Sequence, residues 1–419
     1  MRRNLCFIVH IGTEKTGTTT LQGYLFEAQT QLQEQGTAYY ASPGRIEARG
    51  LSAAAIGDTS ADDYLQQEGI VTPEQRQVFR EKMIEDFQRA VSSLDEHIHT
   101  VVISSEHFHS RLRQPYQLQW LKDLLSPWAR EVQVVVYLRA QTDMLTSYYS
   151  TEVRNGGVRN LEALGRNICH AGNHFYNYRT LLELWGKVFG TNTLTPRLFT
   201  ADNLIQGDIV VDFAAVMGTS SPQLEALKLP RQNESINPAG QALLRGINKA
   251  HRRAENALPA GDCRLLQLEV MAVFSGPGER LPLAVAKALQ SAFEASNQWV
   301  CEQWFKERSA LFPPVSHHYH GKKRSLAFSS EQLALAQTVV SRLERPDVKG
   351  VPELDSCAPY LRDAAVALEG KDTTAARRIM AMAHCIRPHG PFIRGKLGEY
   401  RAQRGILQRM GEWFLRRGS

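Results

Sequence analysis

A lysine, a glycine and four threonines stand close together near the start of the chain, in a pattern suited to binding phosphate. They belong to the segment Gly12-Thr13-Glu14-Lys15-Thr16-Gly17-Thr18-Thr19-Thr20, which follows an apolar run and opens a helical pattern. A turn between a strand and a helix directs backbone N–H groups and the positive end of the helix dipole at one point. The segment therefore predicts a phosphate site, with a threonine-rich turn that merely caps a helix as the alternative.

The position of the lysine distinguishes this segment from the loop of nucleoside-triphosphate enzymes. In those enzymes a lysine directly follows the second glycine, whereas here Thr18 stands at that position and the lysine is Lys15. A P-loop kinase, with Val101-Val102-Ile103 leading to Glu106 as its metal-side strand, is therefore the less favoured interpretation.

A second candidate site follows another apolar run. The run Val134–Leu138 ends at Arg139, and Ser147 lies eight residues further on. Arginine offers a bidentate fork to phosphate, and a serine hydroxyl adds a donor. We expect a helix to begin near Thr142, which would be its N-cap, so Ser147 would lie about one and a half turns into it. For Arg139 alone, a surface salt bridge is the alternative.

Glu106 is the favoured candidate for a general base, a residue that would remove a proton from a substrate. It follows the predicted strand Thr100–Ile103, at the edge where open α/β sheets bind their ligands. His107 and Glu14 are the other candidates, and Glu106 could instead cap the helix that follows it. His109, Arg111 and Arg113 come soon after and could orient an anionic acceptor, or simply form a solvated basic turn.

These motifs resemble those of the sulfotransferases that use 3′-phosphoadenosine 5′-phosphosulfate (PAPS). In that family a strand is followed by Lys-[Ser/Thr]-Gly-Thr-[Thr/Ser], which Lys15-Thr16-Gly17-Thr18-Thr19 matches residue by residue. The resemblance implies that Lys15 steadies the bridging oxygen as the sulfuryl group leaves, and that Arg139 and Ser147 bind the 3′-phosphate. It also implies that the 5′-phosphate is held by Thr16, Gly17, Thr18, Thr19 and Thr20.

The same resemblance implies a reaction. PAPS would be the co-substrate, no metal would be needed, and Glu106 would deprotonate a hydroxyl or, less favoured, an amine. The base is a histidine in relatives that act on small phenols and steroids, and a glutamate in several that act on glycans. We therefore expect a glycan or glycoconjugate acceptor. A small-molecule or lipid acceptor, a kinase, and a non-catalytic helical-repeat adaptor are the alternatives.

The elements that must position these residues alternate between strand and helix. Strands are predicted at Leu5–Ile11, Thr100–Ile103 and Val132–Leu138, and helices over residues 79–94 and 119–125, whereas residues 36–75 read as loops. This alternation predicts an α/β fold with a doubly wound parallel sheet and a P-loop-like phosphate loop. Helical patterns dominate beyond residue 237. We expect a catalytic domain over residues 1–325 and a helical C-terminal region over residues 326–419.

Charge is concentrated in that C-terminal region. The 419 residues carry a net charge of +6, yet the segment from Gly321 onward holds 18 basic and 10 acidic residues, against 31 and 33 in the rest. The charge thus does not indicate a nucleic-acid partner. Arg394–Arg417 reads as a basic amphipathic helix, suited to a protein, a polyanion or a membrane surface; its apolar face could equally pack on preceding helices. The tail also resembles a degenerate tetratricopeptide-type repeat, although a plain helical cap on the catalytic domain is the slightly favoured alternative.

The remaining patterns are weaker. No apolar run approaches the roughly 20 residues that span a bilayer, and no leader is evident, so a cytoplasmic, bacterial enzyme is expected. The six scattered cysteines indicate reduced core residues. A loop closing over the 3′-phosphate could be Arg231–Ser235, in which Asn233 or Ser235 could also cap the helix at 238–250, or Gly321-Lys322-Lys323-Arg324. His317, His318 and His320 read as a linker and not as a metal site.

Overall fold

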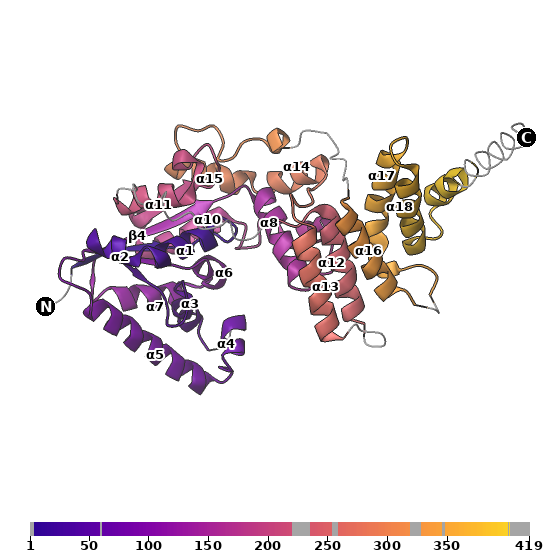
Figure 1. Cartoon of the computed structure of the whole chain (residues 1–419). Coiled ribbons are helices and arrows are strands. Elements are labelled where there is room, and N and C mark those ends of the chain that lie inside the picture. Colours follow the sequence, from indigo (N-terminus) through magenta and orange to yellow (C-terminus); the bar gives the residue numbers. More distant parts are fainter. Residues whose placement is uncertain are drawn as a thin grey trace, which may run out of the picture. The chain divides into compact units, whose positions relative to one another are not determined.

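The computed structural model describes residues 4–58, 61–219, 235–253, 259–318, 328–345, 348–400 and 402. The chain divides into two compact units, each built from separate stretches of sequence (Figure 1). The first unit comprises Met1–Leu145, Gly165–Asn233 and Pro282–His317; the second comprises Thr146–Leu164, Glu234–Leu281 and His318–Ser419. The boundary predicted at residue 325 stays a prediction.

A five-stranded parallel sheet forms the centre of the first unit. Its strand order is β2-β3-β1-β4-β5, and every neighbouring pair is parallel. The strands are β1 (Leu5–His10), β2 (Thr37–Tyr40), β3 (Thr100–Ser104), β4 (Ala129–Leu138) and β5 (Leu194–Leu198). Because β1 lies at the middle, with β3 on one side and β4 on the other, the chain changes direction across the sheet at the carboxyl end of β1. This is where open α/β sheets bind ligands.

Helices cover both faces of the sheet, so it is doubly wound as predicted. Alternate residues of β1 point to opposite faces: Phe7 and Val9 belong to one buried cluster and Ile8 to the other. The face of Ile8 is covered by α1 (Thr18–Glu27), α2 (Gln29–Glu34) and α11 (Ile209–Met217). The other face is covered by helices that include α3 (Arg49–Ala55), α5 (Pro73–Ser92), α6 (His107–Arg111), α7 (Pro115–Leu125), α10 (Tyr178–Phe189) and α15 (Glu294–Trp304).

The second unit is helical. Its main elements are α12 (Pro238–His251), α13 (Ala260–Val273), α16 (Ser330–Leu343), α17 (Ala358–Leu368) and α18 (Thr373–Ile386). Small buried residues, among them Ala364, Ala365 and Ala376, allow α17 and α18 to approach closely. Helical structure beyond residue 237 is therefore confirmed, while the tetratricopeptide-type repeat stays a prediction.

Three local predictions were wrong. Residues 36–75 contain β2, α3 and α4 (Asp63–Gln67). The sequence did not reveal them because all three are too short to show the apolar periodicity that marks longer elements. Helix α8 begins at Gln141, and the hydroxyl of Thr142 lies 3.5 Å from the side chain of Gln290, so Thr142 is not its N-cap. Asn237, and not Ser235, caps α12 by accepting from the Gly240 N–H at 3.0 Å.

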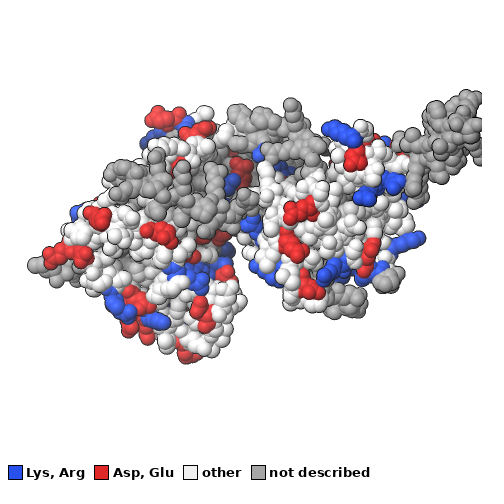
Figure 2. Space-filling view, in the orientation of Figure 1, with Lys and Arg blue, Asp and Glu red and all other residues white. Residues whose placement is uncertain are grey.

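Two further properties concern membrane-spanning helices and cysteines. Among the described helices, none is long and apolar enough to cross a membrane. All six cysteines lie in the described residues and are free thiols, four of them buried. On the face seen in Figure 2, acidic and basic side chains are interspersed over each unit.

Candidate active site

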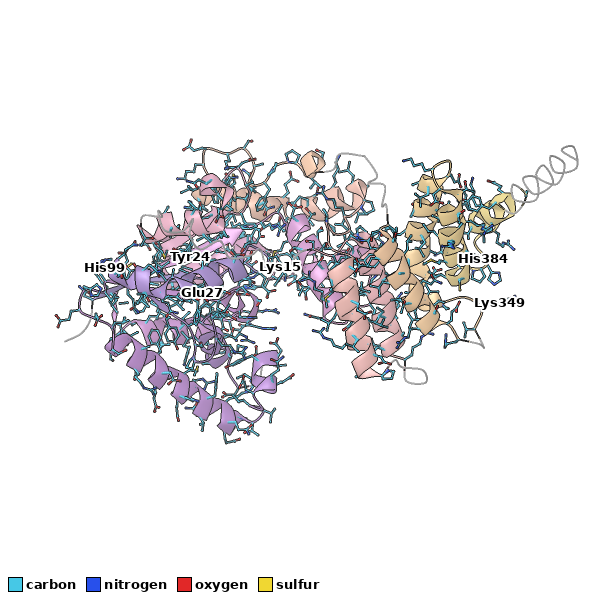
Figure 3. All side chains as sticks on the ribbon, in the orientation of Figure 1. Lys15, Tyr24, Glu27, His99, Lys349 and His384 are labelled. Atoms are coloured by element: carbon cyan, nitrogen blue, oxygen red, sulfur yellow. The ribbon has the colours of Figure 1, made fainter. Side chains whose placement is uncertain are left out.

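The phosphate loop connects β1 to α1 and has an unusual backbone. Gly12, Lys15 and Gly17 all have positive φ, at +101°, +66° and +76°. Gly17 directly precedes α1 and has no side chain that could cap the helix. The N–H groups in the first turn of a helix lack intrahelical partners, and the helix dipole adds positive potential there. The geometry is suited to an anion, and Lys15 lies beside this end of α1, with Tyr24 and Glu27 further along the helix (Figure 3).

The threonine side chains of the loop do different things. The Thr16 hydroxyl donates to the Thr13 carbonyl at 2.6 Å, and the Thr13 hydroxyl donates to the Tyr137 carbonyl at 3.1 Å. Both threonines are fully buried, so their hydroxyls shape the loop. Thr18 is also buried, whereas Thr19 and Thr20 are exposed. Of the predicted phosphate ligands, Thr16 thus has its hydroxyl already engaged within the loop.

The end of β4 holds the other side of the loop. The Tyr137 N–H donates to the Gly12 carbonyl at 2.7 Å, and the Thr13 N–H donates to the Tyr137 carbonyl at 3.2 Å. Two residues further on, Arg139 Nη1 donates to the Lys15 carbonyl at 2.7 Å. Pairing between β1 and β4 therefore continues into the loop, and Arg139 joins the two motifs that the sequence places far apart.

Arg139 is itself held in place. Its N–H donates to the Tyr178 hydroxyl at 3.2 Å, and that hydroxyl donates in turn to the Arg139 carbonyl. Its guanidinium lies 5.7 Å from the centre of the Phe199 ring, and burial lowers its pKa. The guanidinium thus faces the loop and does not form a surface salt bridge, which was the alternative for this residue.

Glu106 follows β3 and lies against the start of the phosphate loop. A Cβ atom placed on Gly12 would lie 3.1 Å from Glu106 Cα, so the two backbones approach as closely as a glycine permits. The Glu106 carboxylate accepts a hydrogen bond from Gln22 Nε2 at 2.6 Å. It does not cap α6, although Glu106 occupies the N-cap position of that helix. The capping alternative is therefore wrong.

His107, the neighbouring candidate base, has a different partner. Its Nε2 lies 3.7 Å from Glu47 Oε1, and the other oxygen of Glu47 accepts from the Ser105 hydroxyl at 2.6 Å. Burial lowers the pKa of His107 to about 4, with the nearby Arg49 acting in the same direction. His107 is therefore neutral at physiological pH.

The charge of Glu106 acts on two further carboxyl groups, those of Glu47 and Glu14. Burial and the charge of Glu106 raise the pKa of Glu47 to about 7. Burial also raises the pKa of Glu14, while Ser110 and Lys15 act against that change. Buried carboxyl groups with displaced pKa values are typical of functional sites, and Glu14 was among the residues proposed for the base.

Two of the basic residues after His107, His109 and Arg111, are held by other parts of the protein and do not form a solvated turn, whereas Arg113 is exposed. His109 is fully buried, and its Nε2 lies 3.1 Å from the Phe175 carbonyl. Arg111 lies 2.9 Å from Asp63 and 3.5 Å from Asp62, so its charge is neutralised locally. Arg113 donates to the Ser110 carbonyl at 3.0 Å.

The remaining predicted site residues lie outside the described part of the first unit. Ser147 lies on α8, in the part of that helix that belongs to the second unit, and its pairing with Arg139 stays a prediction. The segments 231–234 and 321–324, His320 and the tail from residue 403 lie outside the described residues. Within the described residues, no group of three or more His, Cys, Asp or Glu side chains could hold a metal ion.

The sequence did not reveal Gln22 or Glu47 as parts of this site. Gln22 lies one helical turn after Thr18, so its position on α1 was available as a signal once the helix was predicted. Glu47 lies in the stretch that was read as loops, where no pattern marks it.

Comparisons with known proteins add little. No protein-family model matches the chain, and no curated protein matches it. A sulfotransferase structure from Alicyclobacillus acidocaldarius is similar over 53% of this chain and 83% of that chain, at 20% identity and a TM-score of 0.34. A TM-score this low carries no argument about function, and the fold is established by the strand order of this chain itself.

Proposed function

We propose that this chain is a sulfotransferase that uses PAPS to sulfonate a hydroxyl group, with Glu106 as general base. One observation carries the proposal: the ends of the three central strands bring together a glycine- and threonine-rich loop with a lysine, a carboxylate and a guanidinium. The loop follows β1, Glu106 follows β3 and Arg139 follows β4. This arrangement supports an in-line transfer in which the leaving group and the base are held by one sheet edge.

PAPS fits the residues present. The uncapped end of α1 and the Lys15 cation suit its 5′-phosphosulfate, and Arg139 is close to the same loop. When bound, PAPS supplies the sulfuryl group: the acceptor oxygen forms a bond to sulfur as the bond from sulfur to the phosphate oxygen breaks. In this proposal Glu106 takes the acceptor proton, and Lys15 with the α1 N–H groups stabilises the charge left on the phosphate.

The acceptor in this proposal is a hydroxyl of a glycan or glycoconjugate, with a small molecule, a lipid or an amine as alternatives. This choice of acceptor rests on the glutamate, Glu106, at the position of the proposed base. A screen that follows transfer of labelled sulfate from PAPS to glycans, lipids, phenols and amines would identify it.

The test uses Glu106→Gln and Lys15→Ala in that assay, with calorimetry of adenosine 3′,5′-bisphosphate binding. We expect Glu106→Gln to lower kcat by about 10²-fold or more while binding persists, and Lys15→Ala to lower kcat by about 10²–10³-fold. Glu131→Gln, an exposed carboxylate on β4, is the control and should keep full activity. Near wild-type turnover by Glu106→Gln would show that Glu106 is not the general base. Tighter binding of ATP than of the bisphosphate would favour a kinase.

A further inference from the structure

Gln22 connects the phosphate helix to the candidate base. It lies on α1, the helix whose first turn faces the phosphate loop, and its side chain is buried, with 3% of its surface exposed. Its Nε2 donates to Glu106 Oε2 at 2.6 Å. A short bond from a neutral amide to a carboxylate is a strong positioning contact that leaves the charge of the site unchanged.

The amide of Gln22 is itself oriented by a buried polar chain. Its Nε2 lies 3.4 Å from the Ser104 hydroxyl, which in turn lies 2.8 Å from His10 Nδ1. Ser104 and His10 occupy paired positions at the ends of β3 and β1. Burial lowers the pKa of His10 to about 3, so this chain keeps one protonation state across the physiological range. Amide nitrogen has two hydrogens, which allows Gln22 to serve both partners.

These contacts place both ends of the reaction on one rigid element. In the proposed reaction the first turn of α1 would face the leaving phosphate, and the second turn, through Gln22, holds the carboxylate that would accept the proton. Displacing a catalytic group by about 1 Å can cost roughly 10²-fold in rate. Gln22 therefore fixes the Glu106 carboxylate to α1, one helical turn beyond the end of the helix that faces the phosphate loop.

We propose that Gln22 is a positioning residue, which holds the Glu106 carboxylate at a fixed distance from the phosphate loop and keeps it as a hydrogen-bond acceptor. The inference rests on the proposed function, since it assigns Gln22 a role in the same reaction. Gln22 does not touch the reacting atoms and acts through Glu106.

The first variant is Gln22→Leu, which keeps the volume approximately and removes both donors. We expect kcat to fall by about tenfold to a hundredfold, while the Kd for adenosine 3′,5′-bisphosphate stays within about threefold. The control is Gln117→Leu. Gln117 is also 3% exposed and donates to the Ile56 carbonyl at 2.7 Å, yet it lies on α7, so it measures the general cost of losing a buried glutamine. Gln117→Leu should keep the wild-type kcat in its folded fraction.

The second variant, Gln22→Glu, gives a readout that a merely structural role would not move. A carboxylate at this position faces Glu106 with like charge, in a site where Glu14, Glu47, His107 and Tyr39 also interact with one another or with Glu106. Like charges favour protonation, so the acid limb of the kcat profile should move to higher pH. This variant also serves if Gln22→Leu fails to fold.

The outcomes separate this inference from the proposed function. Both proposals are supported if the wild-type protein transfers sulfate and Gln22→Leu has a reduced kcat but still binds the bisphosphate. The role of Gln22 alone is overturned if the wild-type protein is active and the kcat of Gln22→Leu lies within twofold of the wild-type value. An acid limb that does not move in Gln22→Glu would overturn it as well. Equal losses of kcat and bisphosphate affinity would also overturn it, because they would indicate a general disruption of α1. An inactive wild-type protein contradicts the proposed function itself.

Discussion

Arg139 Nη1 donates a hydrogen bond to the carbonyl oxygen of Lys15, at 2.7 Å. The two residues are 124 positions apart in sequence, and the bond joins the end of β4 to the one residue of the phosphate loop that is not glycine and has a positive φ. A positive φ costs a residue with a Cβ about 1–2 kcal/mol. Arg139 therefore helps to hold the lysine in a conformation that an isolated loop would leave.

Replacing this arginine tests its effect on the loop. We expect Arg139→Lys to weaken binding of adenosine 3′,5′-bisphosphate by about 10- to 100-fold, because a lysine keeps the charge but loses the planar fork. Isothermal titration calorimetry measures the change. Arg130→Lys, an exposed arginine at the start of the same strand, should bind as the wild type does. An unchanged Kd in Arg139→Lys would show that the fork is not needed.

The close approach of Gly12 to Glu106 can be tested with a pair of glycines. Gly12→Ala would place Cβ 3.1 Å from Glu106 Cα at a φ of +101°, whereas Gly44→Ala would meet no atom within 4 Å at a φ of +71°. Both variants incur the strain of a positive φ, about 1–2 kcal/mol. Only Gly12→Ala also displaces Glu106, the proposed base, so we expect it to lose at least about tenfold in kcat while Gly44→Ala keeps full activity. Thermal unfolding and steady-state kinetics measure the two effects, and equal activity in both variants would contradict this assignment.

The raised pKa of Glu47 predicts that the stability of the protein changes with pH. Its pKa is raised to about 7 in the folded protein, from an ordinary value of 4.5, by burial and by the charge of Glu106. The folded state therefore binds this proton more tightly than the unfolded state, and the contribution of Glu47 to stability is lost as pH rises from about 4.5 through 7. Urea unfolding between pH 5 and pH 8 should show Glu47→Gln gaining stability relative to wild type as pH rises. Glu85→Gln, at an exposed position, should show no such trend, and parallel curves for wild type and Glu47→Gln would contradict the prediction.

The lowered pKa of His109 predicts a dependence of stability on pH with the opposite sign. Burial lowers its pKa to about 3, from an ordinary value of 6.5, with His174 acting in the same direction. The unfolded state binds the proton more tightly, so stability is lost as pH falls below about 6.5. We expect His109→Gln, which can still donate to the Phe175 carbonyl, to lose less stability than wild type between pH 7 and pH 4.5. His97→Gln, at an exposed site, is the control. A wild-type slope in His109→Gln would indicate that other buried histidines account for acid unfolding.

The sequence predicts the central strands and the phosphate loop because their signals are local. Long apolar runs mark β1, β3 and β4, and a glycine pair with an intervening lysine marks the turn. Parallel strands have their carboxyl ends at one edge, so the gathering of Lys15, Glu106 and Arg139 follows from the strand order alone.

What the sequence does not predict depends on contacts between distant segments. Gln22 and Glu106 are 84 positions apart, and nothing in either segment indicates their hydrogen bond. Glu47 is brought beside Ser105 by a return of the chain after β2, a strand of only four residues. Arg139 would serve as a phosphate ligand on sequence grounds, yet its bond to the Lys15 carbonyl becomes visible only when the two loops are placed together.

The single-sided layout of the sheet has a practical consequence. Lys15, Glu106 and Arg139 each follow the carboxyl end of a strand, so the connectors at the opposite edge lie away from the candidate site. The connector between α5 and β3 is such a segment, and Asp95, Glu96 and His97 in it are exposed. A short peptide tag inserted between Asp95 and Glu96 would lie a full strand length from the candidate site. The connector thus offers a place for immobilising or labelling the protein without altering the candidate site at the opposite edge of the sheet.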